Sequence, residues 1–102
     1  MKIRTGMALA VVMASIIGAS AQGPEIYKSK CQLCHGASGM ADSSVGKAMK
    51  VKPIANPEVK KLTEAEMITA TRNGMGKMKP FKDSLNEAQI KDAVKYFRTF
   101  LK

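Results

Sequence analysis

The chain of 102 residues has no tryptophan, one histidine and only two cysteines. These residues supply three of the four Cys or His ligands that a structural zinc site requires, which disfavours such a site. Two Tyr, three Phe and the lack of any run of five basic residues likewise disfavour nucleic-acid binding. No stretch has the alternating pattern of a strand, and no internal repeat is visible. We therefore expect one all-α domain.

Both cysteines and the histidine lie within residues 31–36, which read CQLCHG. Two cysteines three apart, with a histidine directly after the second, are typical of covalent attachment of a c-type haem. Each thiol forms a thioether with one porphyrin vinyl group, and the adjacent imidazole binds the iron. A dithiol redox pair, a zinc site or a plain disulfide explains the pattern less well. We predict one haem c, attached through Cys31 and Cys34, with His35 as an axial ligand.

The N-terminus is predicted to be a targeting signal. Two basic residues precede an apolar run over residues 7–17, and a small-x-small cleavage site follows at residues 19–21. This run is shorter than the about 20 residues that a membrane span needs. We predict a secretory signal peptide over residues 1–21, and a mature domain over residues 22–102 that lies in the periplasm without stable membrane insertion. An uncleaved signal anchor is the alternative.

The charge of the chain is strongly positive, with 17 Lys and Arg against 8 Asp and Glu and a net charge of +9. Loss of Lys2 and Arg4 with the signal peptide leaves 15 basic residues and a net charge of +7. We expect this surface to attract acidic redox protein partners in transient encounters, and we expect a monomer. A lysine surface that is merely solvated is the alternative interpretation.

Start and stop signals predict several helices. These helices cover residues 23–34, 46–51, 57–61, 64–73 and 87–101. The two longest predicted after the haem motif begin at capping boxes, Thr63 with Glu66 and Asn86 with Gln89. An apolar stripe at helical spacing runs along the last helix, at Ile90, Val94, Phe97 and Leu101. Residues 74–85 are rich in glycine and proline and are predicted to form a loop.

Because the chain has no second histidine, the second axial position of a haem at His35 is predicted to hold a methionine, with a weaker ligand or an open position as the alternatives. Met40 follows His35 too closely for the chain to pass round to the opposite face of the porphyrin. Met49 and Met67 are expected to pack in the core, where methionine often fills gaps.

Met75 and Met78 lie in the glycine-rich loop, where the backbone is free to approach a haem face. We favour Met78 as the axial ligand, because Lys79, Pro80 and Phe81 follow it and would fix the loop. Met75 is the alternative.

Three segments resemble small bacterial class I cytochromes c: residues 31–36 (CQLCHG), 72–81 (RNGMGKMKPF) and 93–98 (AVKYFR). The likeness extends over essentially all of residues 23–102. It implies a fold of three to five helices wrapped around one covalently attached haem, with Met78 as the loop ligand. It also implies that Tyr27 and Tyr96 form the packing pair between the first and last helices.

The chain departs from this family at two places. No proline closely follows His35, whereas in many relatives a proline carbonyl accepts the proton of the proximal histidine. We expect a carbonyl within residues 43–46 to replace it. Tryptophan, which helps to hold a propionate in larger relatives, is absent, and Lys47, Lys50 or Arg72 is the expected replacement.

The resemblance implies a periplasmic electron-transfer protein, not an enzyme, that shuttles single electrons between respiratory redox partners. With both axial positions occupied, the iron has no site for substrate. The alternatives are the haem subunit of a periplasmic dehydrogenase or oxidase complex, and a haem-based ligand sensor or enzyme with a labile sixth ligand.

Overall fold

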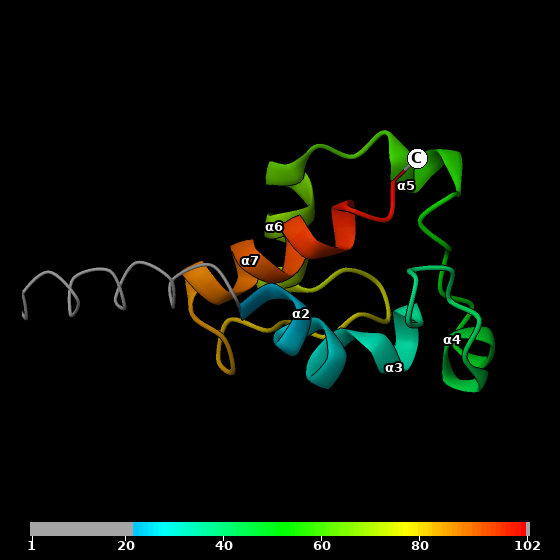
Figure 1. Cartoon of the computed structure of the whole chain (residues 1–102), viewed down its shortest axis with the longest axis horizontal. Coiled ribbons are helices and arrows are strands. Elements are labelled where there is room, and N and C mark those ends of the chain that lie inside the picture. The colour runs from blue at the N-terminus through cyan, green and yellow to red at the C-terminus, as the bar shows by residue number, and fades with distance from the viewer. Residues whose placement is uncertain (1–21, 102) are drawn as a thin grey trace, which may run out of the picture.

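The computed structural model describes residues 22–101, and the predicted signal peptide over residues 1–21 lies outside them. Within the described residues the chain is helical, with five helical segments joined by loops (Figure 1). The extended pairing in this part of the chain is one isolated antiparallel bridge, between Met75 and Met78. The all-α prediction is confirmed. No helix within residues 22–101 has the length and apolar character needed to cross a membrane.

The first segment is a continuous helical run of three elements. It comprises α2 (Gln22–Ile26), the π-helical turn η3 (Tyr27–Cys31) and α3 (Gln32–His35). The run matches the helix predicted from the sequence, except that its middle turn is wider than an α-helix. Gly36 ends the run with φ +84°, a conformation that is strained for residues with a side chain. The C-x-x-C-H motif therefore forms the end of this helical run.

The other segments are α4 (Ser44–Ala48), α5 (Pro57–Lys60), α6 (Glu64–Asn73) and α7 (Glu87–Arg98). Both predicted capping boxes are present, at Thr63 and at Asn86. The largest differences from the prediction are in α4 and α7. Helix α4 begins earlier because the Ser43 side chain caps it, and α7 ends before Leu101. The last residues form tight turns instead, in which the Thr99 hydroxyl donates a hydrogen bond to the Tyr96 carbonyl.

Helices α2 and α7 cross at very close range. A Cβ atom on Gly23 would lie 2.7 Å from the Asp92 carbonyl oxygen and 3.2 Å from the Tyr96 Cβ, so the crossing requires glycine. Beside it, the ring centroids of Tyr27 and Tyr96 are 5.4 Å apart. The aromatic pair predicted between the first and last helices is confirmed.

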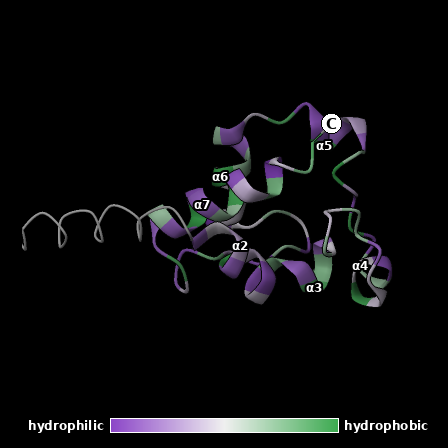
Figure 2. Ribbon diagram, viewed as in Figure 1, coloured by the Kyte–Doolittle hydropathy of each residue, from purple (hydrophilic) through white to green (hydrophobic). Residues whose placement is uncertain are grey.

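The apolar core lies between α2, α6, α7 and the loop that joins α6 to α7. It consists of Ile26, Met67, Phe81, Leu85, Ile90, Ala93 and Val94. Figure 2 shows green and purple residues alternating along α6 and α7, as expected for helices with one buried face. Met67 is 6% exposed, which confirms the prediction that it packs in the core. The same prediction for Met49 is wrong: this residue ends α4 at the surface and is 38% exposed.

The Tyr27 hydroxyl offers a test of how the first helix is tied to the end of the haem motif. It donates a 2.6 Å hydrogen bond to the Gly36 carbonyl, and the residue is only 2% exposed. Burial raises the pKa of Tyr27, so the hydroxyl stays protonated. We expect Tyr27→Phe to lower the free energy of unfolding by about 1–3 kcal/mol, because the buried carbonyl loses its partner. Denaturant titration measures this change.

Tyr96→Phe is the matched control, since the Tyr96 hydroxyl makes no hydrogen bond to another described residue. An equal loss of stability in both variants would contradict the role assigned to the Tyr27 hydroxyl.

Candidate haem site

The two thiols lie one helical turn apart at the end of the first helical run. Cys31 is the last residue of η3 and Cys34 lies in α3, so the two side chains share one side of the helix. Both are partly buried and are not joined by a disulfide. Burial, and to a smaller extent Cys34, raises the pKa of Cys31 to about 11. Cys31 is therefore a protonated thiol at neutral pH, which slows its oxidation.

The His35 imidazole is held in the neutral form that binds metals. Burial lowers its pKa below the usual value of a histidine. Its Nδ1 atom is buried without a hydrogen-bond partner among residues 22–101, and its ring centroid lies 5.2 Å from that of Phe97 in an edge-on arrangement. The expectation that a carbonyl of residues 43–46 accepts the Nδ1 proton is therefore wrong. Phe97 of α7, rather than a carbonyl, is the neighbour that fixes the ring.

Helix α4 supports the haem motif from one side. The Ser43 hydroxyl donates a 2.6 Å hydrogen bond to the Leu33 carbonyl and accepts one from the Gly46 amide at 3.0 Å. A Cβ atom on Gly46 would overlap the Cys34 carbonyl oxygen, so this helix packs directly on the backbone of the motif. The Ala41 amide adds a 2.7 Å hydrogen bond to the His35 carbonyl. The motif is thus held by its backbone, which leaves its thiols and imidazole available to a ligand.

Met75 and Met78 form the ends of a tight hairpin. Each backbone amide donates to the carbonyl of the other, at 3.0 and 2.9 Å, and Gly76 between them has φ +58°. Glycine with positive φ at this first central position is typical of a type II′ turn. Met75 is 62% exposed, whereas Met78 is partly buried against the apolar core. Of the two candidates, Met78 faces the interior, and its role as axial ligand stays a prediction.

The loop that carries this hairpin is anchored on both sides. Phe81 is buried, and its amide donates a 3.0 Å hydrogen bond to the Thr71 carbonyl. Arg72 makes two hydrogen bonds to the carboxylate of Glu87, at 2.8 and 2.6 Å, which join the end of α6 to the start of α7. Arg72 is therefore engaged, and its candidacy as a propionate partner is not supported.

Three supporting residues were missed from the sequence: Ser43, Gly46 and Phe97. The Ser-Ser pair before Val45 is a helix-start signal that was available for Ser43. Nothing local indicates that Gly46 contacts Cys34 or that Phe97 contacts His35, because both contacts depend on how the helices pack.

The residues present fit a covalently bound haem. Two thiols and a neutral imidazole lie within five residues at one helix end, and the buried Nδ1 atom has no hydrogen-bond partner among the described residues. A partly buried thioether is supplied by Met78. Imidazole and thioether are the donor types that bind haem iron in cytochromes c, and the two thiols are the groups that attach the porphyrin.

Comparison with known proteins agrees with this site. Residues 18–97 match the family described as cytochrome C oxidase, cbb3-type, subunit III. Among solved structures, the chain is similar to the KustC0563 c-type cytochrome, at 28% identity and a TM-score of 0.71, over 79% of this chain and 99% of that one. No curated protein matches the chain.

The helical fold and the C-x-x-C-H site define a small c-type cytochrome, a class that implies covalently bound haem c. Within that class, the chain belongs to the family of cbb3-type cytochrome c oxidase subunit III.

A methyl group added at Gly46 tests the contact of this residue with the haem motif. We expect Gly46→Ala to lower the free energy of unfolding by about 1–3 kcal/mol, because the added methyl group must displace the backbone at Cys34. Thermal or denaturant unfolding of the holoprotein measures the change. Ser44→Ala, at an exposed position of the same helix, is the control and should change stability by less than about 0.5 kcal/mol. A neutral Gly46→Ala variant would show that α4 does not pack as described.

Proposed function

We propose that this chain is a periplasmic electron-transfer protein with one haem c, attached through Cys31 and Cys34 and ligated by His35 and Met78. The observation that carries the proposal is the half-buried imidazole of His35 directly after the second of two partly buried thiols at a helix end. When bound, the haem iron alternates between the ferric and ferrous states and so carries one electron.

Each protein group has a defined part in this function. The two cysteines fix one edge of the porphyrin to the end of the first helical run, and α4 keeps that end rigid. Phe97 orients the His35 ring, and the hairpin holds the Met78 thioether near the core. A thioether ligand favours the ferrous state and raises the reduction potential. With both axial positions filled, the iron offers no site to a substrate, which fits a carrier and not an enzyme.

The positive surface supports a transient encounter with an acidic redox protein. Lys28 and Lys30 are exposed on η3, and Lys77 and Lys79 are exposed on and next to the hairpin. These lysines flank the two segments that would hold the haem. Such charges raise the association rate more than the affinity, as an electron carrier requires. The proposed partner is a protein and not a nucleic acid.

A second candidate function is supported by the family itself, which is described as a subunit of an oxidase. In this case the chain is the haem subunit of a periplasmic oxidase or dehydrogenase complex, with the same haem site. Size-exclusion chromatography of extract from the native host separates the two functions. A carrier elutes at the size of a monomer, whereas a subunit elutes with a much larger complex.

The axial ligand is tested by optical spectra of the oxidised and reduced holoprotein. We expect a long-wavelength sulfur-to-iron band in the wild type and in Met75→Ala, and its loss in Met78→Ala, because only Met78 faces the interior. Met75→Ala is the matched control from the same hairpin. A high-spin wild-type spectrum would contradict His35/Met78 ligation and favour a haem with a labile sixth ligand. A band that persists in both variants would contradict ligation by Met78 and indicate a different sulfur ligand.

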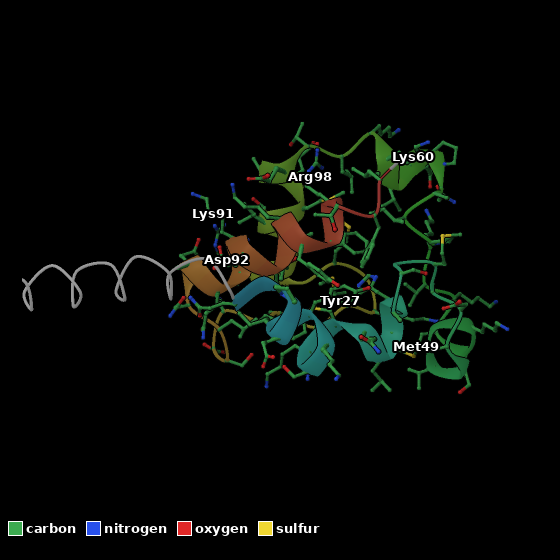
Figure 3. All side chains as sticks on the ribbon, viewed as in Figure 1. Tyr27, Met49, Lys60, Lys91, Asp92 and Arg98 are labelled. Atoms are coloured by element: carbon green, nitrogen blue, oxygen red, sulfur yellow. The ribbon has the colours of Figure 1, made fainter. Side chains whose placement is uncertain are left out.

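The electrostatic role of the lysines is tested with two small oxidants of opposite charge. We expect the rate of oxidation by anionic ferricyanide to fall as ionic strength rises, because salt screens the attraction to the lysines, and the rate with cationic tris(phenanthroline)cobalt(III) to rise. Lys77→Gln should weaken both trends. Lys91→Gln is the control, since Figure 3 shows Lys91 at the end of the molecule away from α3. Rates that do not depend on salt would contradict the proposal.

A further inference from the structure

Met75 is the most exposed methionine in the part of the chain that the structure describes. It is 62% exposed, against 44% for Met40, 38% for Met49 and 6% for Met67. Met78, the proposed axial ligand, is partly buried against the apolar core. The proposed function assigns no role to Met75, although this residue lies three positions before the ligand. Its thioether is therefore a reactive group whose task is still to be explained.

The hairpin places the two thioethers on the same side of its backbone. Met75 and Met78 are directly opposite each other, because each amide donates to the carbonyl of the other. Side chains of such a pair project from one face of the ladder, with Cβ atoms about 4.5–5.5 Å apart. Met75 is the more exposed member of the pair. A small molecule that approaches this face of the hairpin from solvent therefore meets Met75 first.

Backbone contacts at the base of the hairpin keep this arrangement fixed. A Cβ atom on Gly74 would lie 2.9 Å from the Met78 carbonyl oxygen and 3.0 Å from the Pro80 nitrogen, so the two sides of the base are in close contact. After the hairpin, the Phe81 and Lys82 amides donate hydrogen bonds of 3.0 and 3.2 Å to carbonyls at the end of α6. Exchanging the exposed and the buried methionine would require these contacts to break.

Beside Met75, the surface of α6 is hollowed. A cavity of about 340 Å³ is lined by Met75, by Leu62 and by side chains of α6, which are Ala65, Glu66, Thr69 and Ala70. The Glu66 carboxylate accepts a hydrogen bond from the Thr63 amide in the capping box. Of the described residues that line the cavity, Met75 alone carries a group that mild oxidants attack. A small oxidant that enters this cavity therefore reaches the Met75 sulfur.

We propose that Met75 is a site of oxidation to methionine sulfoxide by hypohalous acids, and that it intercepts these oxidants before they reach the Met78 ligand. The Met75 sulfur displaces hydroxide from the chlorine of hypochlorous acid and forms an S–Cl bond. Water then displaces chloride and leaves the S=O bond of the sulfoxide. The thioether and hypochlorous acid thus give sulfoxide, chloride and one proton, with sulfur oxidised and chlorine reduced by two electrons. The inference rests on the proposed function, since it takes Met78 as the iron ligand.

The two methionines differ in what a sulfoxide would do to the protein. At Met78 it would replace the thioether that favours ferrous iron, and it would add a polar oxygen beside the apolar core. At Met75 the added oxygen lies in solvent, and the hydrogen bonds of the hairpin involve the backbone. Because hypohalous acids react rapidly with thioethers, the sulfur that they meet first consumes a limiting dose. Oxidation at Met75 therefore spares the iron ligand and leaves the fold intact.

The test treats the holoprotein with a single equivalent of hypochlorous acid and locates the sulfoxides by peptide mass spectrometry. Trypsin separates the two sites, because cleavage after Lys77 leaves Met75 in residues 73–77 and Met78 in residues 78–82. We expect the sulfoxide of the wild type to lie mainly at Met75. In Met75→Leu we expect at least about twofold more sulfoxide at Met78, with a matching loss of the sulfur-to-iron band.

Met49→Leu is the matched control for this experiment. Met49 is also an exposed methionine, but it ends α4 and lies outside the hairpin (Figure 3). Its replacement should change neither the sulfoxide at Met78 nor the band.

Equal sulfoxide at Met78 in Met75→Leu and in the wild type would overturn the inference, as would a wild type that is oxidised first at Met40 or Met49. Should Met75→Leu not accumulate as holoprotein, the order of oxidation in the wild type decides: Met75 before Met78 supports the inference, and the reverse order overturns it. A wild type whose band depends on Met78, yet whose ligand Met75 does not protect, refutes the role of Met75 alone. A wild type without this band before oxidation refutes the proposed ligation by Met78.

Discussion

The close crossing of α2 and α7 at Gly23 is the contact on which the rest of the structure depends. There the backbone of one helix lies against the Asp92 carbonyl, with no space for a side chain. Because the helices meet at this distance, Phe97 reaches the imidazole of His35. The orientation of the proximal ligand therefore comes from helix packing as much as from the motif that contains it.

The helices that the sequence predicted well are those whose signals are local. The capping boxes at Thr63 and Asn86 each join residues three apart, so their partners are visible in a short stretch of sequence. The end of α7 was predicted too late, because the apolar stripe continues to Leu101 while the Thr99 hydroxyl competes for a helical carbonyl. We identify no residue within η3 that explains why its turn is π-helical.

The residues of the candidate site also fall into two groups, those that a local sequence pattern predicts and those that depend on how the helices pack. Cys31, Cys34 and His35 were predictable because covalent attachment of a haem requires this spacing of the three residues. The bond from the Ser43 hydroxyl to the Leu33 carbonyl spans ten residues and depends on the placement of α4. The type of a side chain likewise does not reveal which residue, distant in the sequence, it will pair with.

Arg72 illustrates this limit. Its charge made it a candidate for a propionate, yet its guanidinium is bound by Glu87, 15 residues further along the chain. A cation can be recognised in a sequence, but the anion that it meets is decided by the fold.

The aromatic crossing also determines what optical methods can observe. The chain has no tryptophan, and its two tyrosines, Tyr27 and Tyr96, lie side by side between α2 and α7. The intrinsic ultraviolet emission of the polypeptide therefore comes from a single point of the structure. In the haem-free polypeptide, whose emission no porphyrin quenches, fluorescence will follow the separation of the first and last helices closely, but it is insensitive to events confined to α4 and α5. A reporter of those two helices has to be introduced by labelling.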